Sequence, residues 1–121
     1  MPASLRIALV GVSHWHAPRY AEALRARGAL LCGASDTDPA AGATAAARLG
    51  VEFIAPTEAM IERLRPDFAV VLPRHDHAAD EIARVAALRV PMLVEKPMGR
   101  HAQEAERAAA AIEAAGIFAS V

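Results

Sequence analysis

Residues able to do chemistry gather at three places in this 121-residue sequence, each directly after an apolar run. The run at 5–10 is followed by Gly-Val-Ser-His-Trp-His at 11–16, and the run at 91–94 by Glu-Lys-Pro at 95–97. The run at 68–72 is followed by Pro-Arg-His-Asp-His at 73–77. A glycine after a strand can begin a phosphate-binding turn, paired histidines can hold a metal ion, and a lysine can transfer a proton.

Lys96 is the only lysine in a chain that otherwise uses arginine as its basic residue. A desolvated lysine can lose its proton at a reachable pH, whereas arginine effectively cannot. This difference indicates that position 96 needs a property that arginine lacks. We therefore take Lys96 as the candidate catalytic residue.

The apolar runs must position these residues, and their pattern predicts parallel strands. Nearly continuous hydrophobicity without polar alternation is typical of strands covered on both faces. We expect strands at 5–10, 29–34, 51–54, 68–72 and 91–94 and from 117 onward, with helices at 17–27, 39–49, 57–64, 78–89 and 101–115. Thr57 is a candidate cap for the third of these helices. The alternation predicts an α/β fold with a doubly wound parallel sheet of about six strands, order 3-2-1-4-5-6, and helices on both faces.

In that strand order the crevice lies between strands one and four. The loops at 11–18 and 73–77 then face each other across it, so a ligand should bind there. Gly11 can make the tight turn of a dinucleotide loop, and Ser13 stands where a second glycine is usual. His16, in place of the third glycine, is the main departure, although the following helix N-terminus would still offer N–H groups to an anion.

Asp36 follows the second strand at the offset expected for a carboxylate that binds the adenosine ribose. The alternative is that Asp36 or Asp38 merely caps the helix that begins near Pro39. Residues 37–39 contain no arginine that could bind a 2′-phosphate. The sequence therefore favours NAD over NADP.

The segment from Leu72 to Gly116 resembles the second half of the nucleotide-binding domain of Gfo/Idh/MocA-type oxidoreductases. Pro73, His77 and the Glu-Lys-Pro at 95–97 match the family pattern position by position, and the resemblance extends over residues 5–121. It implies that Lys96 lies near the nicotinamide and the substrate, with Glu95 beside it. The cofactor-binding residues it implies are Gly11, Val12, Ser13, His14, Trp15, Asp36, Leu72, Pro73, His77, Glu95 and Lys96.

The resemblance also implies hydride transfer between NAD(P) and a sugar, a cyclitol or a related polyol. Residues 1–121 would form the dinucleotide-binding domain, and the family's substrate and oligomerisation domain is absent from this chain. We therefore expect no turnover from this chain alone and treat homo-oligomerisation as open. The Lys96–Pro97 bond is a candidate cis peptide, since cis bonds occur almost only before proline.

Composition excludes several other classes of function. A net charge of −1 with interspersed charges gives no footprint for nucleic acid, and no apolar run approaches the length of a membrane span. The sequence begins without a secretory signal, so we expect a cytoplasmic protein. The single cysteine, Cys32, cannot form an internal disulfide, and we expect it in the core.

Two alternative functions stay open from the sequence. One is a nucleotide- or ligand-binding module without catalysis. The other is a metal site built from His14, His16, His75 and His77 with Asp76 or Asp80, although Ala79 interrupts the usual His-x-His-x-Asp-His run. We expect Trp15 to pack against the domain, and Tyr20 to lie in the core without a catalytic role.

Overall fold

A parallel sheet forms the centre of the protein in the computed structural model, which describes residues 4–121. The strands are β1 (Arg6–Val10), β2 (Leu30–Ser35), β3 (Phe68–Val71), β4 (Met92–Val94) and β5 (Ala119–Ser120). The helices are α1 (Ala17–Ala26), α2 (Pro39–Leu49), α3 (Thr57–Leu64), α4 (Ala78–Ala87) and α5 (Ala102–Ala115), with a 3₁₀ turn at His75–His77. The strand order is β2-β1-β3-β4-β5, and all pairs are parallel.

This order confirms the predicted doubly wound fold with one correction. The segment at 51–54 makes only a single parallel bridge, between Phe53 and Ala34 of β2, and is not a strand. The Glu52 carbonyl accepts the Ala34 N–H at 2.8 Å, so the segment still lies at the β2 edge where a third strand was expected. The other elements match their predicted ranges within two residues at each end.

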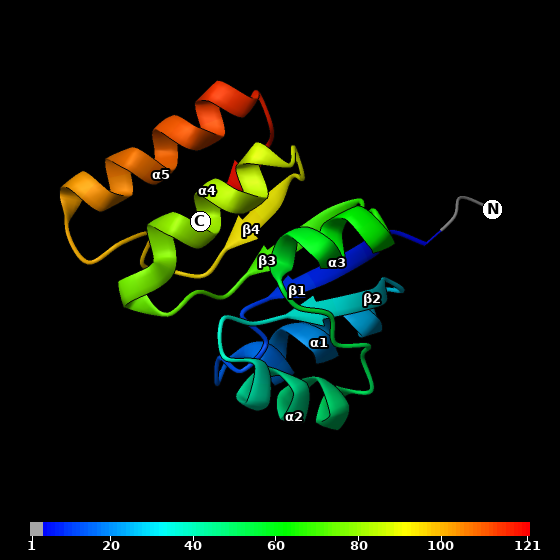
Figure 1. The fold of residues 1–121 in the computed structure, drawn as a ribbon. Coiled ribbons are helices and arrows are strands. Elements are labelled where there is room, and N and C mark those ends of the chain that lie inside the picture. The colour runs from blue at the N-terminus through cyan, green and yellow to red at the C-terminus, as the bar shows by residue number, and fades with distance from the viewer. Residues whose placement is uncertain (1–3) are drawn as a thin grey trace.

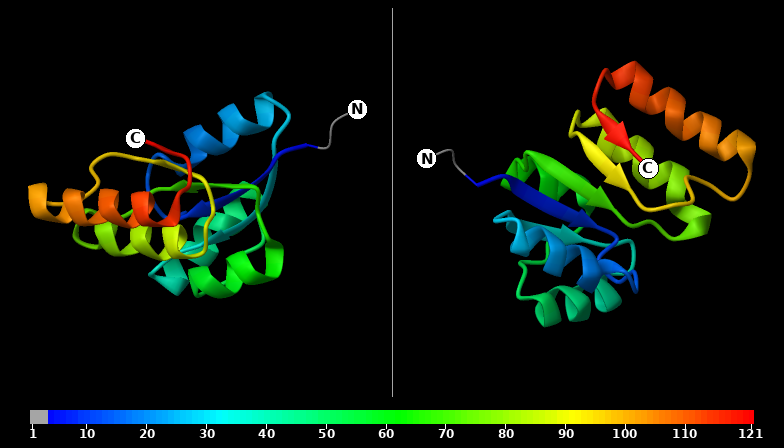
Figure 2. Two further views of the ribbon diagram at one scale, coloured as in Figure 1. Left: turned by 90° about the horizontal axis from the view of Figure 1, so that it is seen from above. Right: turned by 180° about the vertical axis from the view of Figure 1, so that it is seen from behind.

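Helices cover both faces of the sheet, as Figures 1 and 2 show. On one face, α1 and α2 pack over a core that includes Leu9, Ala21 and Ala46. On the other face, α3, α4 and α5 pack over a core that includes Met60, Ile82 and Met92. Because the chain winds in both directions from β1 and β3, the loops after these two strands face each other at the carboxyl edge.

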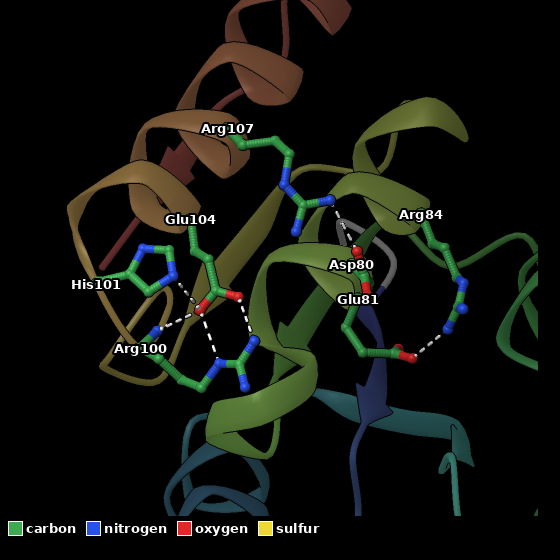
Figure 3. Close-up of polar contacts among 7 residues, drawn as sticks. All are labelled: Asp80, Glu81, Arg84, Arg100, His101, Glu104 and Arg107. Carbon is green, nitrogen blue, oxygen red and sulfur yellow. Dashed lines mark hydrogen bonds and ion pairs between the residues drawn. The ribbon is translucent and has the colours of Figure 1, made fainter.

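The outermost layer is α5, which lies along α4 (Figure 1). Arg107 pairs with Asp80 of α4 at 2.9 Å, and Arg100 pairs with Glu104 at the start of α5 at 3.0 Å (Figure 3). Ala108 is the fully buried residue of this helix. Within residues 4–121, none of the helices combines the length and apolar character that a bilayer crossing requires.

One irregularity interrupts the pairing of β1 with β2. Ile7 pairs with Leu31, but the next residue, Ala8, pairs with Gly33, so Cys32 has no partner in the register. This extra residue is a β-bulge, which shifts the alternation of side chains beyond it. Cys32 is half-buried against the α3 and α4 face, and burial raises the pKa of its thiol.

Candidate functional site

Gly11 makes the sharp turn at the end of β1. Its φ is +86°, and a Cβ atom there would lie 2.1 Å from the carbonyl oxygen of Leu72. The N–H groups of Gly11 and Val12 donate to the Ser35 carbonyl at 2.9 and 3.2 Å. Only glycine suits this position, because it must adopt a positive φ and allow the close approach of another backbone.

Asp36, which follows β2, is held by backbone donors. It is only 6% exposed. Its Oδ2 accepts the Ser13 N–H at 2.7 Å, and its Oδ1 accepts the Asp38 N–H at 2.9 Å. The neighbouring Asp38, not Asp36, caps α2 by accepting the Ala41 N–H at 3.1 Å. Asp36 is therefore left beside the Gly11 turn, as a ribose-binding carboxylate would be.

Ser35 anchors this end of β2 to α3. Its hydroxyl lies 2.9 Å from the hydroxyl of Thr57, and both residues are buried. The prediction that Thr57 caps α3 is wrong. Pro56 occupies the N-cap position and Thr57 is the first helical residue, so its side chain is free to bond across to the strand.

The start of α1 differs from the expected anion site, because its N–H groups are already used. Ala17 donates to the His14 carbonyl at 2.9 Å, and Arg19 and Tyr20 donate to the His16 carbonyl at 3.0 and 3.3 Å. Pro18 has no N–H to offer. From Gly11 to Ala17, Trp15 carries the one backbone N–H without an acceptor among the residues that the structure describes.

The aromatic side chains of this loop stack on one another at its surface. The ring centroids of Trp15 and His16 are 3.9 Å apart, and those of His14 and His16 are 5.2 Å apart. Trp15 is 76% exposed, so the expectation that it packs against the domain is wrong. Partial burial and the nearby His16 lower the pKa of His14 below its ordinary value.

Glu95, at the end of β4, is held by two side chains of the first loop and α1. Its Oε1 lies 2.9 Å from His16 Nδ1, and its Oε2 accepts a hydrogen bond from the Tyr20 hydroxyl. The hydrogen bond to Glu95 raises the pKa of Tyr20 to about 12. The same bond lowers the pKa of Glu95, with His16 adding to the effect. Tyr20 does pack its ring on the core, but sequence reasoning missed its polar contact.

Lys96 is exposed beside this network. No ion pair or side-chain hydrogen bond joins it to any residue in the described range of the chain. The Lys96–Pro97 peptide is cis, as predicted. The ammonium group is thus free to meet a ligand at the carboxyl edge of β4.

A cleft of about 560 Å³ lies where the two predicted loops meet. The predicted residues that line it are Gly11, Ser13, His14, Trp15, Asp36, Leu72, Pro73 and His77. Val12 is buried beneath the loop, and Glu95 and Lys96 lie outside the lining. Glu81 also lines the cleft and was missed; its only signal was a carboxylate next to Ile82 on the apolar stripe of α4.

The four histidines do not assemble the alternative metal site. Within residues 4–121, no three side chains of histidine, cysteine, aspartate or glutamate lie in an arrangement that could hold a metal ion. His16 is engaged by Glu95, and His77 lies 3.6 Å from Asp76 at the exposed end of the cleft.

Comparison with protein families gives one match over nearly the whole chain. The family model GFO_IDH_MocA, an oxidoreductase family with an NAD-binding Rossmann fold, matches residues 5–121. No curated protein sequence matches the chain.

Solved structures similar to this chain include dehydrogenases. GenD2 from gentamicin A biosynthesis, in complex with NAD, is 26% identical with a TM-score of 0.83, covering 99% of this chain and 34% of that one. The WlbA dehydrogenase from Chromobacterium violaceum, with NADH and UDP-GlcNAcA, is 22% identical with a TM-score of 0.85, covering 98% and 35%. Myo-inositol 2-dehydrogenase from Lactobacillus plantarum is 21% identical with a TM-score of 0.80, covering 98% and 36%. The chain spans about a third of the length of these proteins.

Proposed function

The chain belongs to the GFO_IDH_MocA oxidoreductase family, as an NAD-binding Rossmann domain, and we propose that it binds NAD in the cleft between the loops after β1 and β3. The observation that carries this proposal is Asp36, a nearly buried carboxylate held beside the Gly11 turn. A carboxylate so placed accepts hydrogen bonds from the two ribose hydroxyls and repels a 2′-phosphate. It therefore supports NAD over NADP.

The residues of the first loop fit the pyrophosphate of this coenzyme. The N–H of Trp15 is available as a donor, and Ser13, whose side chain is exposed, adds a hydroxyl next to it. Leu72, Pro73 and His77 form the opposite wall, and Gly11 and Val12 fix the turn at the floor. Because α1 offers no free N–H group in its first turn, the loop itself must carry the anion.

We further propose that this chain is the NAD-binding part of a longer enzyme that oxidises or reduces a sugar, a cyclitol or a related polyol. Bound NAD would accept the hydride in the oxidation, and bound NADH would donate it in the reduction. Lys96, exposed and unpaired at the end of β4 in the described structure, would orient the reacting hydroxyl and exchange its proton. Similar chains are a dehydrogenase solved with UDP-GlcNAcA and a myo-inositol 2-dehydrogenase, which supports a hydroxyl-bearing substrate.

A cytoplasmic location belongs to the same proposal, because an NAD-dependent oxidoreductase works where its soluble coenzyme is kept. A ligand-binding module without catalysis is the second candidate. It is favoured by one observation: Glu95 uses one carboxylate oxygen on His16 of the first loop and the other on Tyr20 of α1, so neither oxygen is free of a protein partner. Oxidation of a polyol by a longer parent chain would exclude this candidate.

The test of the proposal is a titration with NADH and NADPH that follows the fluorescence of Trp15, the only tryptophan. We expect saturable binding of NADH, weaker binding of NADPH, and at least roughly tenfold weaker NADH binding in Asp36→Ala, because charge-assisted hydrogen bonds are lost. Asp38→Ala is the matched control, since Asp38 caps α2 outside the cleft lining. Absence of a response to either nucleotide in folded protein would contradict NAD binding.

A further inference from the structure

Glu81, in α4, is a buried carboxylate without an assigned role. It is 3% exposed, although burial of a charged group is costly unless it is paired. Arg84 donates to its Oε1 at 2.6 Å, as Figure 3 shows. Its Oε2 has no hydrogen-bond partner among the described residues. In the described residues, every fully buried side-chain polar atom has a hydrogen-bond partner. Because Oε2 has none, it must reach accessible surface.

The accessible surface next to Glu81 belongs to two neighbouring clefts. One is the 560 Å³ cleft that we assign to NAD. The other, of about 760 Å³, lies between the starts of α3 and α4. Asp36, Thr37, His77 and Glu81 line both clefts, so Glu81 stands at the boundary between them. The negative charge of Asp36 is near enough to help burial raise the pKa of Glu81.

This boundary is where an adenine would lie. A ribose bound by Asp36, with its phosphate toward the Gly11 turn, directs the base away from that turn and toward Thr37, His77 and Glu81. Adenine carries a 6-amino group with two N–H donors, and Glu81 Oε2 is an acceptor without a protein partner. We propose that Glu81 accepts a hydrogen bond from the 6-amino group of NAD and thereby selects adenine over a 6-oxopurine. This inference rests on the proposed function.

Arg84 holds the carboxylate in place for this role. It binds Glu81 Oε1 on one side and lies 3.4 Å from Glu58 of α3 on the other. The ion pair compensates the buried charge of Glu81. Because Arg84 holds Oε1, it also fixes the orientation of the carboxylate and hence the direction of Oε2. Glu81 thus differs from Glu58, which pairs with the same arginine but lines only the second cleft.

The experiment compares the binding of NADH with that of reduced nicotinamide hypoxanthine dinucleotide, in which a 6-oxo group replaces the 6-amino group. In the unaltered protein, the carboxylate would face a carbonyl oxygen, so we expect roughly tenfold tighter binding of NADH. Glu81→Gln should bring the two affinities close together, because a glutamine amide can also donate to the 6-oxo group. Titration calorimetry gives both affinities directly.

Glu58→Gln is the matched control, since it loosens the same arginine without altering the NAD cleft; it should keep the preference for NADH. Equal binding of the two nucleotides by the unaltered protein would overturn the role of Glu81 and leave NAD binding intact. An unchanged preference in Glu81→Gln would also overturn it. Binding of neither nucleotide would overturn the proposed function and this inference with it. If Glu81→Gln does not fold, Glu81→Asp, with a shorter side chain, should likewise weaken the preference.

Discussion

Two carboxylates lie at the same edge of the sheet but are held in different ways. Asp36, after β2, accepts hydrogen bonds from the backbone N–H groups of Ser13 and Asp38. Glu95, after β4, is bound by the side chains of His16 and Tyr20. Every residue type except proline supplies a backbone donor, whereas side-chain donors depend on sequence and can ionise. Around Asp36, which we call the β2 half of the crevice, the contacts therefore do not depend on the side chains of Ser13 and Asp38. Around Glu95, the β4 half, they depend on the side chains of His16 and Tyr20.

The loop after β1 serves both halves. Ser13 supplies the donor to Asp36, and His16 reaches Glu95, which lies 79 residues further along the chain. His16 replaces the third glycine of a dinucleotide loop, and its imidazole explains the replacement: it links the loop to the strand that carries Lys96. The residue that departs from the glycine pattern is thus the one that contacts the β4 half.

Replacing Gly11 should have the largest effect, because both halves depend on its turn. Gly11→Ala places a methyl group against the Leu72 carbonyl and forces a positive φ on alanine, so we expect a loss of about 3–5 kcal/mol in the free energy of unfolding. Urea denaturation measures this loss. Gly28→Ala is the control: its φ is +82° but nothing lies within 4 Å, so only about 1–2 kcal/mol of backbone strain applies. Equal losses in the two variants would show that the contact with Leu72 is unimportant.

The second prediction tests the β4 half through the pH at which Tyr20 ionises. Tyr20 is the only tyrosine, so the absorbance of tyrosinate reports its ionisation alone. We expect Glu95→Gln to lower the pKa of Tyr20 from about 12 toward its ordinary value of about 10. Because the folded pKa lies above the unfolded one, this contribution to stability is present below about pH 10 and is lost as the pH rises toward 12.

The control for this titration is Glu22→Gln, an exposed change on the same helix. It should leave the ionisation of Tyr20 as in the unaltered protein. Circular dichroism across the same pH range separates ionisation from alkaline unfolding. A Tyr20 titration that is identical in Glu95→Gln and the unaltered protein would refute the hydrogen bond between them.

Lys96→Ala should have the smallest effect on stability. Lys96 is exposed and pairs with no described residue, so the free energy of unfolding should change by less than about 0.5 kcal/mol. In a longer parent chain that oxidises a polyol, the same variant should lose activity, and Lys96→Arg should not restore it, because arginine does not release its proton. Full activity in Lys96→Ala would remove Lys96 from the reaction.

Much of this architecture follows from local sequence pattern. Apolar runs and amphipathic helices predicted the winding of the sheet, and Glu-Lys-Pro at 95–97 predicted the family and the cis peptide. Asp36, with no arginine after it, predicted the NAD coenzyme. All four predictions are confirmed. These features depend on neighbouring residues or on a contiguous motif. The prediction of a strand at 51–54 is wrong because this segment lies at the edge of β2 with a single bridge and forms no ladder of backbone hydrogen bonds.

The contacts within the site could not be predicted, because they join distant residues. No spacing rule links Tyr20 to Glu95, and the helical stripe placed Tyr20 in the core on the evidence of its ring alone. Trp15 is exposed because it stacks on His16 at the loop surface, a choice that its sequence neighbours do not reveal. Glu81 was hidden because a charged residue on an apolar stripe is ordinarily taken for the edge of the exposed face.

The unpaired Cys32 determines which residue of β2 can be deleted without moving Asp36. Every other residue of β2 between Leu30 and Ser35 has a partner in β1, and Asp36 follows on the face that this register sets. Loss of Cys32 would keep every existing pair and leave Asp36 facing the same way. Loss of Ala34 would shift the register by one, and a one-residue shift turns each following side chain to the opposite face. Of these two deletions, only the loss of Cys32 would therefore keep the coenzyme carboxylate in its cleft.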